Sequence, residues 1–171
     1  MDLTKKTGIN LTKGSKISLE KNGTNLTEIT IGLNWGAIKT PGFLGIFSST
    51  ESVDLDGTIA MFDAQGQWVD TVYYKKLVSS DKAVRHSGDD RSGDTGNPDE
   101  FDNETIYIEL NKVNPKVDSI FIFLNSYKKQ DFDTIPYSKI KIYEGNPNTV
   151  KSIFATFNLS KEEDFKGKIS M

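Results

Sequence analysis

The sequence contains no cysteine and only one histidine, His86, among its 171 residues. Without cysteine there is no disulfide bond, no thiolate metal site and no cysteine nucleophile. Zinc and copper sites, which draw on histidine and cysteine, are disfavoured for the same reason. Any metal site in this chain must therefore be built from oxygen ligands.

Long hydrophobic runs are also missing. The longest strictly apolar run covers Ile120–Leu124, whereas a helix that crosses a bilayer needs about 20 apolar residues. Lys5 and Lys6 are followed by polar residues instead of the apolar stretch of a signal peptide. These absences predict a protein without a membrane span and with a cytoplasmic location.

The composition is that of an ordinary folded protein with little excess charge. Hydrophobic residues make up 36% of the chain, charged residues make up 26%, and the net charge is −3. This length predicts one domain, residues 1–171. The acidic balance argues against a nucleic-acid partner, because nucleic-acid binding depends on basic side chains that neutralise phosphates.

Alternation of apolar and polar residues recurs along the chain. Every second residue of Ile29–Trp35 is a large apolar one, and the same period recurs in residues 105–110, 140–142 and 153–159. Val117–Asn125 is apolar on both faces at its centre, which predicts an interior strand. We therefore expect an all-β fold, an antiparallel β-sandwich of two sheets with long loops and at most short helices.

Turn residues separate these strands. Asn22-Gly23 is typical of a two-residue hairpin, and Asp63–Gln67 is a polar turn. Ser160 and Glu163 have the spacing of a capping box, which predicts one short helix near the C-terminus. No segment of helical length carries an apolar stripe with a period of 3.6 residues.

Three segments are expected to be loops. Residues 39–52 contain an apolar insert, Pro41–Phe47, with too many glycines for a strand. Residues 125–137 form a second expected loop, and residues 78–103 form a long polar connection between strands. Long loops inside a compact domain are often functional.

The acidic residues are concentrated in the long polar connection. Residues 88–104 hold seven acidic side chains against Arg91 alone, a charge of −6, so that the remaining residues together carry +3. Asp54 and Asp56 form a separate acidic pair, and their side chains share one face if they lie in a strand. Two carboxylates about 4 Å apart repel each other by about 4 kcal/mol at an effective dielectric constant of 20. The acidic side chains therefore either stay apart in solvent or share a cation.

Calcium suits this set of ligands best. It takes 6–8 oxygen ligands at about 2.3–2.6 Å, whereas Mg²⁺ keeps more water. An EF-hand does not fit, because the twelfth position counted from Asp54 is Gln65 instead of a bidentate glutamate. The long acidic connection is thus interpreted as an ion-binding loop, and a solvated loop that binds nothing is the alternative.

Catalysis has no positive signal in the sequence. His86 precedes the acidic connection and is either a structural hydrogen-bonding residue or a general base. No phosphate-binding glycine motif and no Ser/His/Asp arrangement can be identified by spacing. We therefore expect a protein that is not an enzyme.

Several segments, taken in order, resemble the TerD family of bacterial tellurium-resistance and general stress proteins. They cover nearly the whole chain and include Gly8–Gly14, Ile31–Trp35, Gly42–Phe47, Ser52–Asp56, His86–Asp90, Asn125–Tyr127 and Ala155–Ser160. The resemblance implies a β-sandwich that binds Ca²⁺ at two neighbouring sites and has no established enzymatic activity.

The resemblance also implies a set of ligands, matched position by position. The implied metal-site residues are Asp54, Asp56, Asp89, Asp90, Gly93, Asp102, Asn103 and Glu104, with Asp99, Asp94 and Glu100 as candidates in a loop that is longer than usual. Gly93 would supply a backbone carbonyl or a tight bend. Asp90 stands where the family has asparagine, and Asn103 stands in place of an aspartate but still offers an amide oxygen.

Three hypotheses of function follow. The first is a cytosolic calcium-binding stress-response protein that acts as an interaction module, with protein partners in a stress-resistance complex. The second is a metal-dependent phosphoester hydrolase, with Asp54, Asp56 and Asp90 holding the metal and His86 acting as the base. The third is a binder of anionic ligands through a bridging Ca²⁺.

Overall fold

The structure, a computed structural model, describes residues 8–12, 15–40, 49–96, 101–149, 152–160 and 166–170. Nearly all regular structure within these ranges is strand, and the one helix is the short 3-10 turn η2, Leu110–Lys112. The predicted all-β fold is confirmed. No helix in the described ranges is long and apolar enough to cross a membrane.

The larger sheet has six strands, which pair in the order β1-β13-β12-β4-β10-β9. All neighbours are antiparallel except β1 and β13, which are parallel. The strands are β1 Ile9–Leu11, β13 Ser152–Asn158, β12 Ser138–Glu144, β4 Ile29–Trp35, β10 Glu104–Ile108 and β9 Val84–His86.

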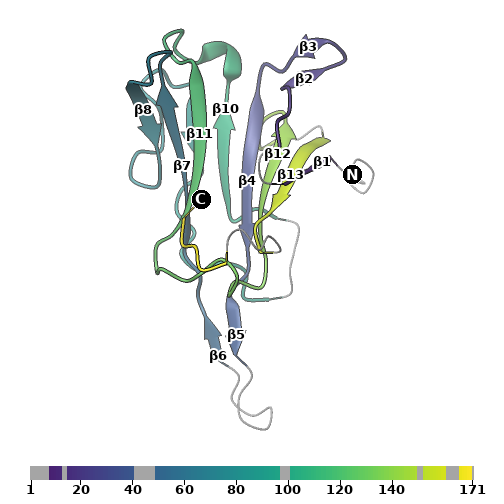
Figure 1. Ribbon diagram of the computed structural model, residues 1–171, viewed down its shortest axis with the longest axis vertical. Coiled ribbons are helices and arrows are strands. Elements are labelled where there is room, and N and C mark those ends of the chain that lie inside the picture. Colours follow the sequence, from purple (N-terminus) through teal and green to yellow (C-terminus); the bar gives the residue numbers. More distant parts are fainter. Residues whose placement is uncertain are drawn as a thin grey trace.

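The smaller sheet has three antiparallel strands in the order β11-β7-β8 and faces the larger one (Figure 1). Its strands are β11 Ser119–Ser126, β7 Leu55–Phe62 and β8 Trp68–Val72. Two short hairpins project from the ends of the sandwich, one formed by β2 Glu20–Lys21 and β3 Thr24–Asn25, the other by β5 Ile38–Thr40 and β6 Ser49–Glu51.

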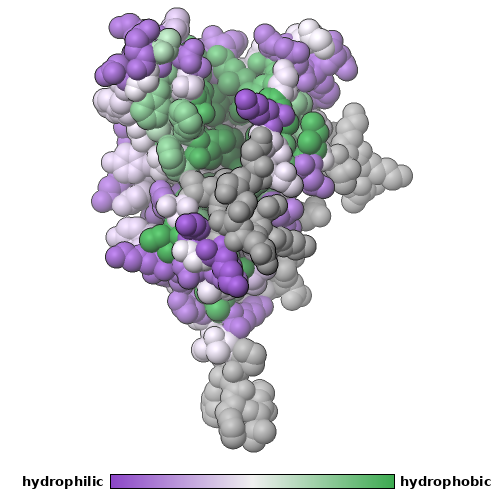
Figure 2. Space-filling model, in the orientation of Figure 1, coloured by the Kyte–Doolittle hydropathy of each residue, from purple (hydrophilic) through white to green (hydrophobic). Residues whose placement is uncertain are grey.

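The core lies between the two sheets. Ile31, Leu33 and Trp35 of β4 are fully buried and pack with Ile59 of β7 and Ile106 of β10 in one hydrophobic cluster. Figure 2 shows apolar side chains gathered between the sheets in the upper half of one face, where the smaller sheet covers the larger one incompletely. Burial of this cluster supplies the main driving force for folding.

Strand β4 is buried on both faces, because loops cover its outer side. The Thr30 hydroxyl donates to the Gly145 carbonyl at 2.7 Å, and the Asn34 amide donates to the Phe101 carbonyl at 2.5 Å. These bonds satisfy polar groups that would otherwise be costly to bury. The loop that follows Phe101 is thereby held against the outer face of β4.

Both turn predictions are confirmed. Asn22 and Gly23 have positive φ values of 53° and 75°, as a two-residue hairpin between β2 and β3 requires. The Asp63–Gln67 turn joins β7 and β8, and the Asp63 carboxylate accepts hydrogen bonds from the N–H groups of Gln65 and Gln67. The helix expected from Ser160 and Glu163 lies largely outside the described residues.

The prediction that Val117–Asn125 forms an interior strand is wrong. Among the described strands, β11 lies at the edge of the smaller sheet. Its outward residues Phe121 and Phe123 are 51% and 39% exposed, and their rings stack with a centroid separation of 6.4 Å. Phe121 also packs edge-to-face on Phe62. Among the described residues, aromatic rings that contact one another and stay partly exposed form the apolar outer face of β11.

The expected loops hold more strand than predicted. Residues 38–40 and 49–51 form the β5/β6 hairpin, while the apolar insert Pro41–Phe47 lies outside the described residues. The polar connection 78–103 contains β9, which pairs with β10 and was missed because it is only three residues long. Of the loop expected over residues 125–137, residues 125 and 126 belong to β11, and residues 127–137 form no strand before β12.

Candidate metal centre

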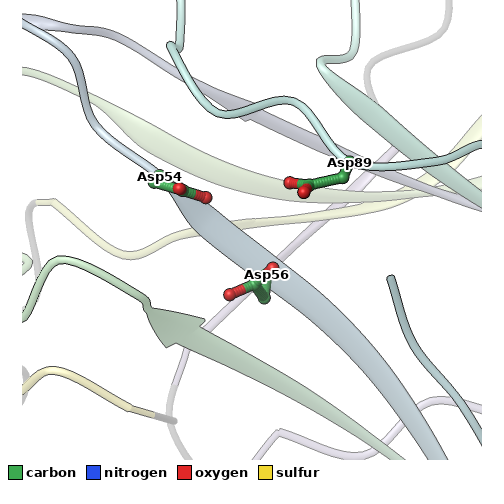
Figure 3. A group of neighbouring side chains, drawn as sticks. All are labelled: Asp54, Asp56 and Asp89. Carbon is green, nitrogen blue, oxygen red and sulfur yellow. The ribbon is translucent and has the colours of Figure 1, made fainter. Parts of the chain in front are cut away.

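Three aspartates converge where β7 begins (Figure 3). Asp54 precedes β7, Asp56 lies within it, and Asp89 comes from the loop that follows β9. One carboxylate oxygen from each residue lies within 4.8 Å of the other two. Asp54 and Asp56 are buried, whereas Asp89 is exposed. The resemblance to the TerD family implied that these two segments, distant in sequence, contribute to one site, and the three carboxylates do lie together.

The Asp54 carboxylate is incompletely satisfied within the described part of the protein. Its side chain is only 4% exposed, yet Oδ1 has no hydrogen-bond partner there. The Arg91 Nε lies 3.9 Å from Oδ2, on a side chain that is 74% exposed. A buried carboxylate oxygen without a partner is costly, and here it faces two further carboxylates.

The pKa values of the two buried aspartates reflect this crowding. Burial raises the pKa of Asp54, and the negative charge of Asp89 raises it further. Burial, followed by the charges of Asp54 and Glu104, raises the pKa of Asp56 to about 6. Without a cation, the cluster therefore relieves its repulsion by holding on to protons.

Glu104 lies behind the cluster and connects its supporting segments. Its carboxylate is fully buried and accepts hydrogen bonds from the Gly57 N–H at 3.1 Å and the Asp90 N–H at 3.2 Å. The first bond reaches β7, and the second reaches the loop that carries Asp89. Glu104 thus positions the two segments that supply the three converging carboxylates.

His86 is a structural residue in this arrangement. Its Nδ1 accepts a hydrogen bond from the Gly88 N–H at 3.0 Å, so Nε2 carries the proton. Nε2 lies 3.2 Å from the Gly57 carbonyl and 3.4 Å from Glu104. Both ring nitrogens are therefore engaged inside the protein, and the side chain is fully buried.

Four further residues line the same site. Tyr74, Lys75, Arg91 and Tyr127 enclose, with the three aspartates, a pocket of about 210 Å³. The Tyr127 N–H donates to the Asp54 carbonyl at 2.9 Å. Sequence reasoning missed Tyr74 and Lys75, because they lie in a turn after β8 that has no spacing relation to the acidic residues.

The TerD domain family model matches residues 7–171 of the chain. The chain belongs to the TerD family. It is 32% identical over 128 residues to tellurium resistance protein TerZ of Serratia marcescens, an alignment that covers 74% of this chain and 64% of TerZ. The chain thus spans less than two thirds of TerZ.

Another relative and one solved structure agree with this assignment. Stress response protein SCP2 of Bacillus subtilis (strain 168) is 30% identical over 148 residues, which cover 80% of this chain and 71% of SCP2. The crystal structure of a homologue of the telluride resistance protein TerD from Streptomyces coelicolor A3(2) superimposes with a TM-score of 0.63 at 17% identity, covering 85% of this chain and 78% of that chain. At that identity, the likeness concerns the fold.

Of the residues implied by resemblance to the TerD family, Asp90 lies beside the three-aspartate cluster but is engaged by its own loop. Its Oδ1 accepts hydrogen bonds from the Ser92 N–H and hydroxyl at 2.9 and 2.8 Å and from the Gly93 N–H at 3.2 Å. Burial alone would raise the pKa of Asp90, but these bonds and one from Asn103 hold it below its usual range. Gly93 forms the predicted tight bend, with φ 67°.

Asn103 presents its amide N–H groups, and not its oxygen, to the neighbouring carboxylates. Nδ2 donates to Asp90 at 3.2 Å and to Asp94 at 3.0 Å. Oδ1 accepts the backbone N–H of Trp35 at 2.8 Å. Because a backbone N–H can only donate, this bond sets the orientation of the amide. The amide oxygen expected to coordinate an ion is therefore already engaged.

Asp102 lies apart from the three-aspartate cluster. It forms an ion pair with Lys141 at 2.9 Å, and both side chains are largely buried. Lys141 is opposite Gly32 in the β12–β4 register, and the missing side chain of Gly32 makes room for the Asp102 carboxylate. Asp99 and Glu100 lie outside the described residues.

Proposed function

We propose that this TerD-family protein is a calcium-binding protein whose principal ion is held by Asp54, Asp56 and Asp89. The observation that carries the proposal is the buried Asp54 Oδ1, which has no hydrogen-bond partner in the described part of the chain and lies in a group of three carboxylates. A divalent cation would supply the missing partner and remove the repulsion within the group.

The spacing of the carboxylates fits one calcium ion. Two oxygens bound to the same Ca²⁺ at about 2.3–2.6 Å lie at most about 5 Å apart, and the three carboxylate oxygens lie within 4.8 Å of one another. The absence of cysteine and the engagement of the single histidine favour a hard cation over zinc or copper. Calcium would act here by neutralising charge and joining β7 to the Asp89 loop.

A second ion, implied by the family resemblance, belongs near Asp90 and Asp94. We propose that it binds more weakly than the first, because Asn103 already donates hydrogen bonds to both carboxylates. Binding of that ion would require these bonds to break. The expected order of affinities therefore follows from Asn103, which stands where the TerD family has an aspartate.

The role we propose is binding, and not catalysis, in a cytoplasmic stress response with protein partners. A role in the stress response is supported by the names of the relatives, tellurium resistance protein TerZ and stress response protein SCP2. The hydrolase alternative needs His86 as a base, but both of its ring nitrogens are engaged within the fold. No specific observation therefore favours hydrolysis.

Isothermal titration of the metal-stripped protein, first with Ca²⁺ and then with Mg²⁺, tests the proposal. Calcium is expected to bind more tightly than magnesium, and Asp54→Asn is expected to weaken the first binding event by about tenfold or more, because ligand charge controls calcium affinity. Asp118→Asn is the matched control, since Asp118 adjoins the opposite end of β7 through its bond to Phe62. No heat of calcium binding in the unmodified protein would contradict the proposal.

A further inference from the structure

The pocket at the three-aspartate cluster has a second wall of different chemistry. Asp54, Asp56 and Asp89 form one side, whereas Tyr74, Lys75, Arg91 and Tyr127 complete the lining of its approximately 210 Å³. A site that only held a structural cation would need no basic or aromatic wall. The second wall therefore calls for a separate physical explanation.

The two basic side chains of this wall lie toward solvent. Arg91 is 74% exposed, and its Nε lies 3.9 Å from Asp54, a distance too long for a hydrogen bond. The Lys75 Nζ lies 5.3 Å from the centre of the Tyr74 ring. Lys128 differs from both, because its Nζ donates to the Ser52 carbonyl and hydroxyl, whereas Lys75 interacts with Tyr74, which itself lines the pocket. Lys75 and Arg91 are thus placed to meet a ligand that enters the pocket.

The two tyrosines of this wall lie beside the segment that carries Asp54. The rings of Tyr74 and Tyr127 pack edge-to-face, with centroids 6.4 Å apart and an angle of 78°. Tyr127 is nevertheless 61% exposed, and its N–H donates to the Asp54 carbonyl. An exposed ring beside a pocket offers a face on which a flat group can pack.

Charge decides which ligand would enter. Without a cation, the three carboxylates repel anions. With a divalent ion bound, four positive charges, two from the ion and one each from Lys75 and Arg91, face three negative charges in the pocket. Calcium takes 6–8 oxygen ligands, whereas the three aspartates bring one converging oxygen each, so coordination positions stay open toward the pocket.

We propose that the calcium-loaded pocket binds a small phosphate monoester that carries a flat ring. Phosphate oxygens would complete the coordination of the ion and accept hydrogen bonds from Lys75 and Arg91, while the ring packs against Tyr127. A phosphate dianion matches two separate basic groups and a cation better than a carboxylate does. The inference rests on the proposed calcium site. A lipid whose headgroup is a phosphate monoester is the other source of the same phosphate chemistry.

Titration of the calcium-saturated protein with phenyl phosphate tests the inference. Phenyl phosphate is expected to bind only while calcium is present, with chelation lowering its affinity by about tenfold or more. Lys75→Gln and Arg91→Gln are each expected to lower its affinity by about fivefold, given their exposure. Lys116→Gln is the matched control, because exposed Lys116 lies in the turn before β11. An equal loss in this control would overturn the inference.

The ring contact and the source of the phosphate have tests of their own. Tyr127→Ala is expected to weaken phenyl phosphate by about threefold and to leave methyl phosphate unchanged; an equal loss for both would overturn the ring contact. Calcium-dependent sedimentation with phosphatidic acid vesicles, without binding of phenyl phosphate, would overturn the inference in favour of a lipid headgroup. Calcium uptake without phenyl phosphate binding overturns this inference alone, whereas no calcium uptake overturns the proposed function as well.

Discussion

At the scale of single residues, the same carboxylate group behaves in opposite ways in different surroundings. Burial alone would raise the pKa of Asp70, but hydrogen bonds from Lys76, Ser80 and Thr71 lower it to about 2. Asp56 has carboxylates as neighbours instead, and burial together with their charge raises its pKa to about 6. Asp70 is therefore a stabilising structural carboxylate, and Asp56 is stabilised only by a proton or a cation.

The raised pKa of Asp56 predicts opposite pH responses with and without calcium. Between the unfolded pKa of about 3.9 and the folded pKa of about 6, the metal-free folded protein binds more protons than the unfolded chain. This group therefore adds stability as the pH falls through about 6, and the added stability is lost as the pH rises through about 6. Calcium needs the deprotonated carboxylate, so its effect weakens in the same window.

Melting temperatures measured from pH 7.5 to about 5, with calcium and with chelator, check this expectation. The difference between the two curves is expected to shrink as the pH falls below about 6. A difference that stays constant or grows would contradict the role of Asp56. In chelator, Asp56→Asn provides the control, because it removes this titrating group and should flatten the pH dependence of the metal-free protein.

Asn103→Asp is expected to strengthen the second calcium site. The change replaces the Nδ2 donor to Asp90 and Asp94 with a third carboxylate oxygen, which raises ligand charge where a cation is needed. Titration calorimetry should show the second binding event tightening by about tenfold. Asn111→Asp, at an exposed position in η2, adds the same charge elsewhere and should leave both events unchanged. If the second calcium-binding event of Asn103→Asp has an unchanged affinity, the assignment of the second site to Asp90 and Asp94 is contradicted.

At the scale of elements, β7 serves the core and the candidate site at once. Leu55 and Ile59 are fully buried, whereas Asp56 joins the metal cluster. Gly57 makes this double role possible, because a side chain there would collide with Leu33 and lie 3.3 Å from the Glu104 carboxylate. The close approach of β7 to β4 and β10 therefore depends on one glycine.

Gly57→Ala is expected to lower the free energy of unfolding by about 1–3 kcal/mol, as overpacking of a core does. It should also weaken calcium binding, because the Gly57 N–H donates to Glu104 and any shift of β7 moves Asp56. Denaturant unfolding and calcium titration measure the two effects. Gly96→Ala is the matched control, since an added Cβ at Gly96 meets nothing within 4 Å. Unchanged stability in Gly57→Ala would refute the packing argument.

At the scale of the whole molecule, three acidic residues meet where a cation would connect two separate segments of the fold. Calcium bound near Asp54 and Asp89 would join the smaller sheet to the loop that follows β9 of the larger sheet. An ion that binds only the folded form stabilises it by about 2.7 kcal/mol when its free concentration is a hundred times Kd. In a chain of this length, that corresponds to a rise in melting temperature of about 5–10 °C.

Calorimetry or fluorescence melting with millimolar calcium checks this rise. Chelator should reverse it, and Asp54→Asn should abolish most of it. Melting that does not respond to calcium would count against a cation that joins the two sheets. Magnesium at the same concentration is expected to raise the melting temperature less, because it releases its water reluctantly.

The sequence predicted the strands that carry a clear period of two residues. Residues 29–35, 105–110 and 153–159 match β4, β10 and β13 closely. The pattern failed for β9, whose three residues are too few to show a period. It also failed for the placement of β11, because an apolar outer face packed by its own aromatic rings looks the same in sequence as a face covered by another layer.

By itself, the sequence determined the all-β class, the oxygen-only chemistry of any metal site and the need for its aspartates either to separate or to share a cation. The tertiary structure alone decided which carboxylates meet. Asp89 reaches Asp54 and Asp56, Asp102 pairs with Lys141 across Gly32, and the Trp35 N–H orients Asn103. Composition sets the charges that a chain must accommodate, whereas their partners depend on strand pairing between segments far apart in sequence.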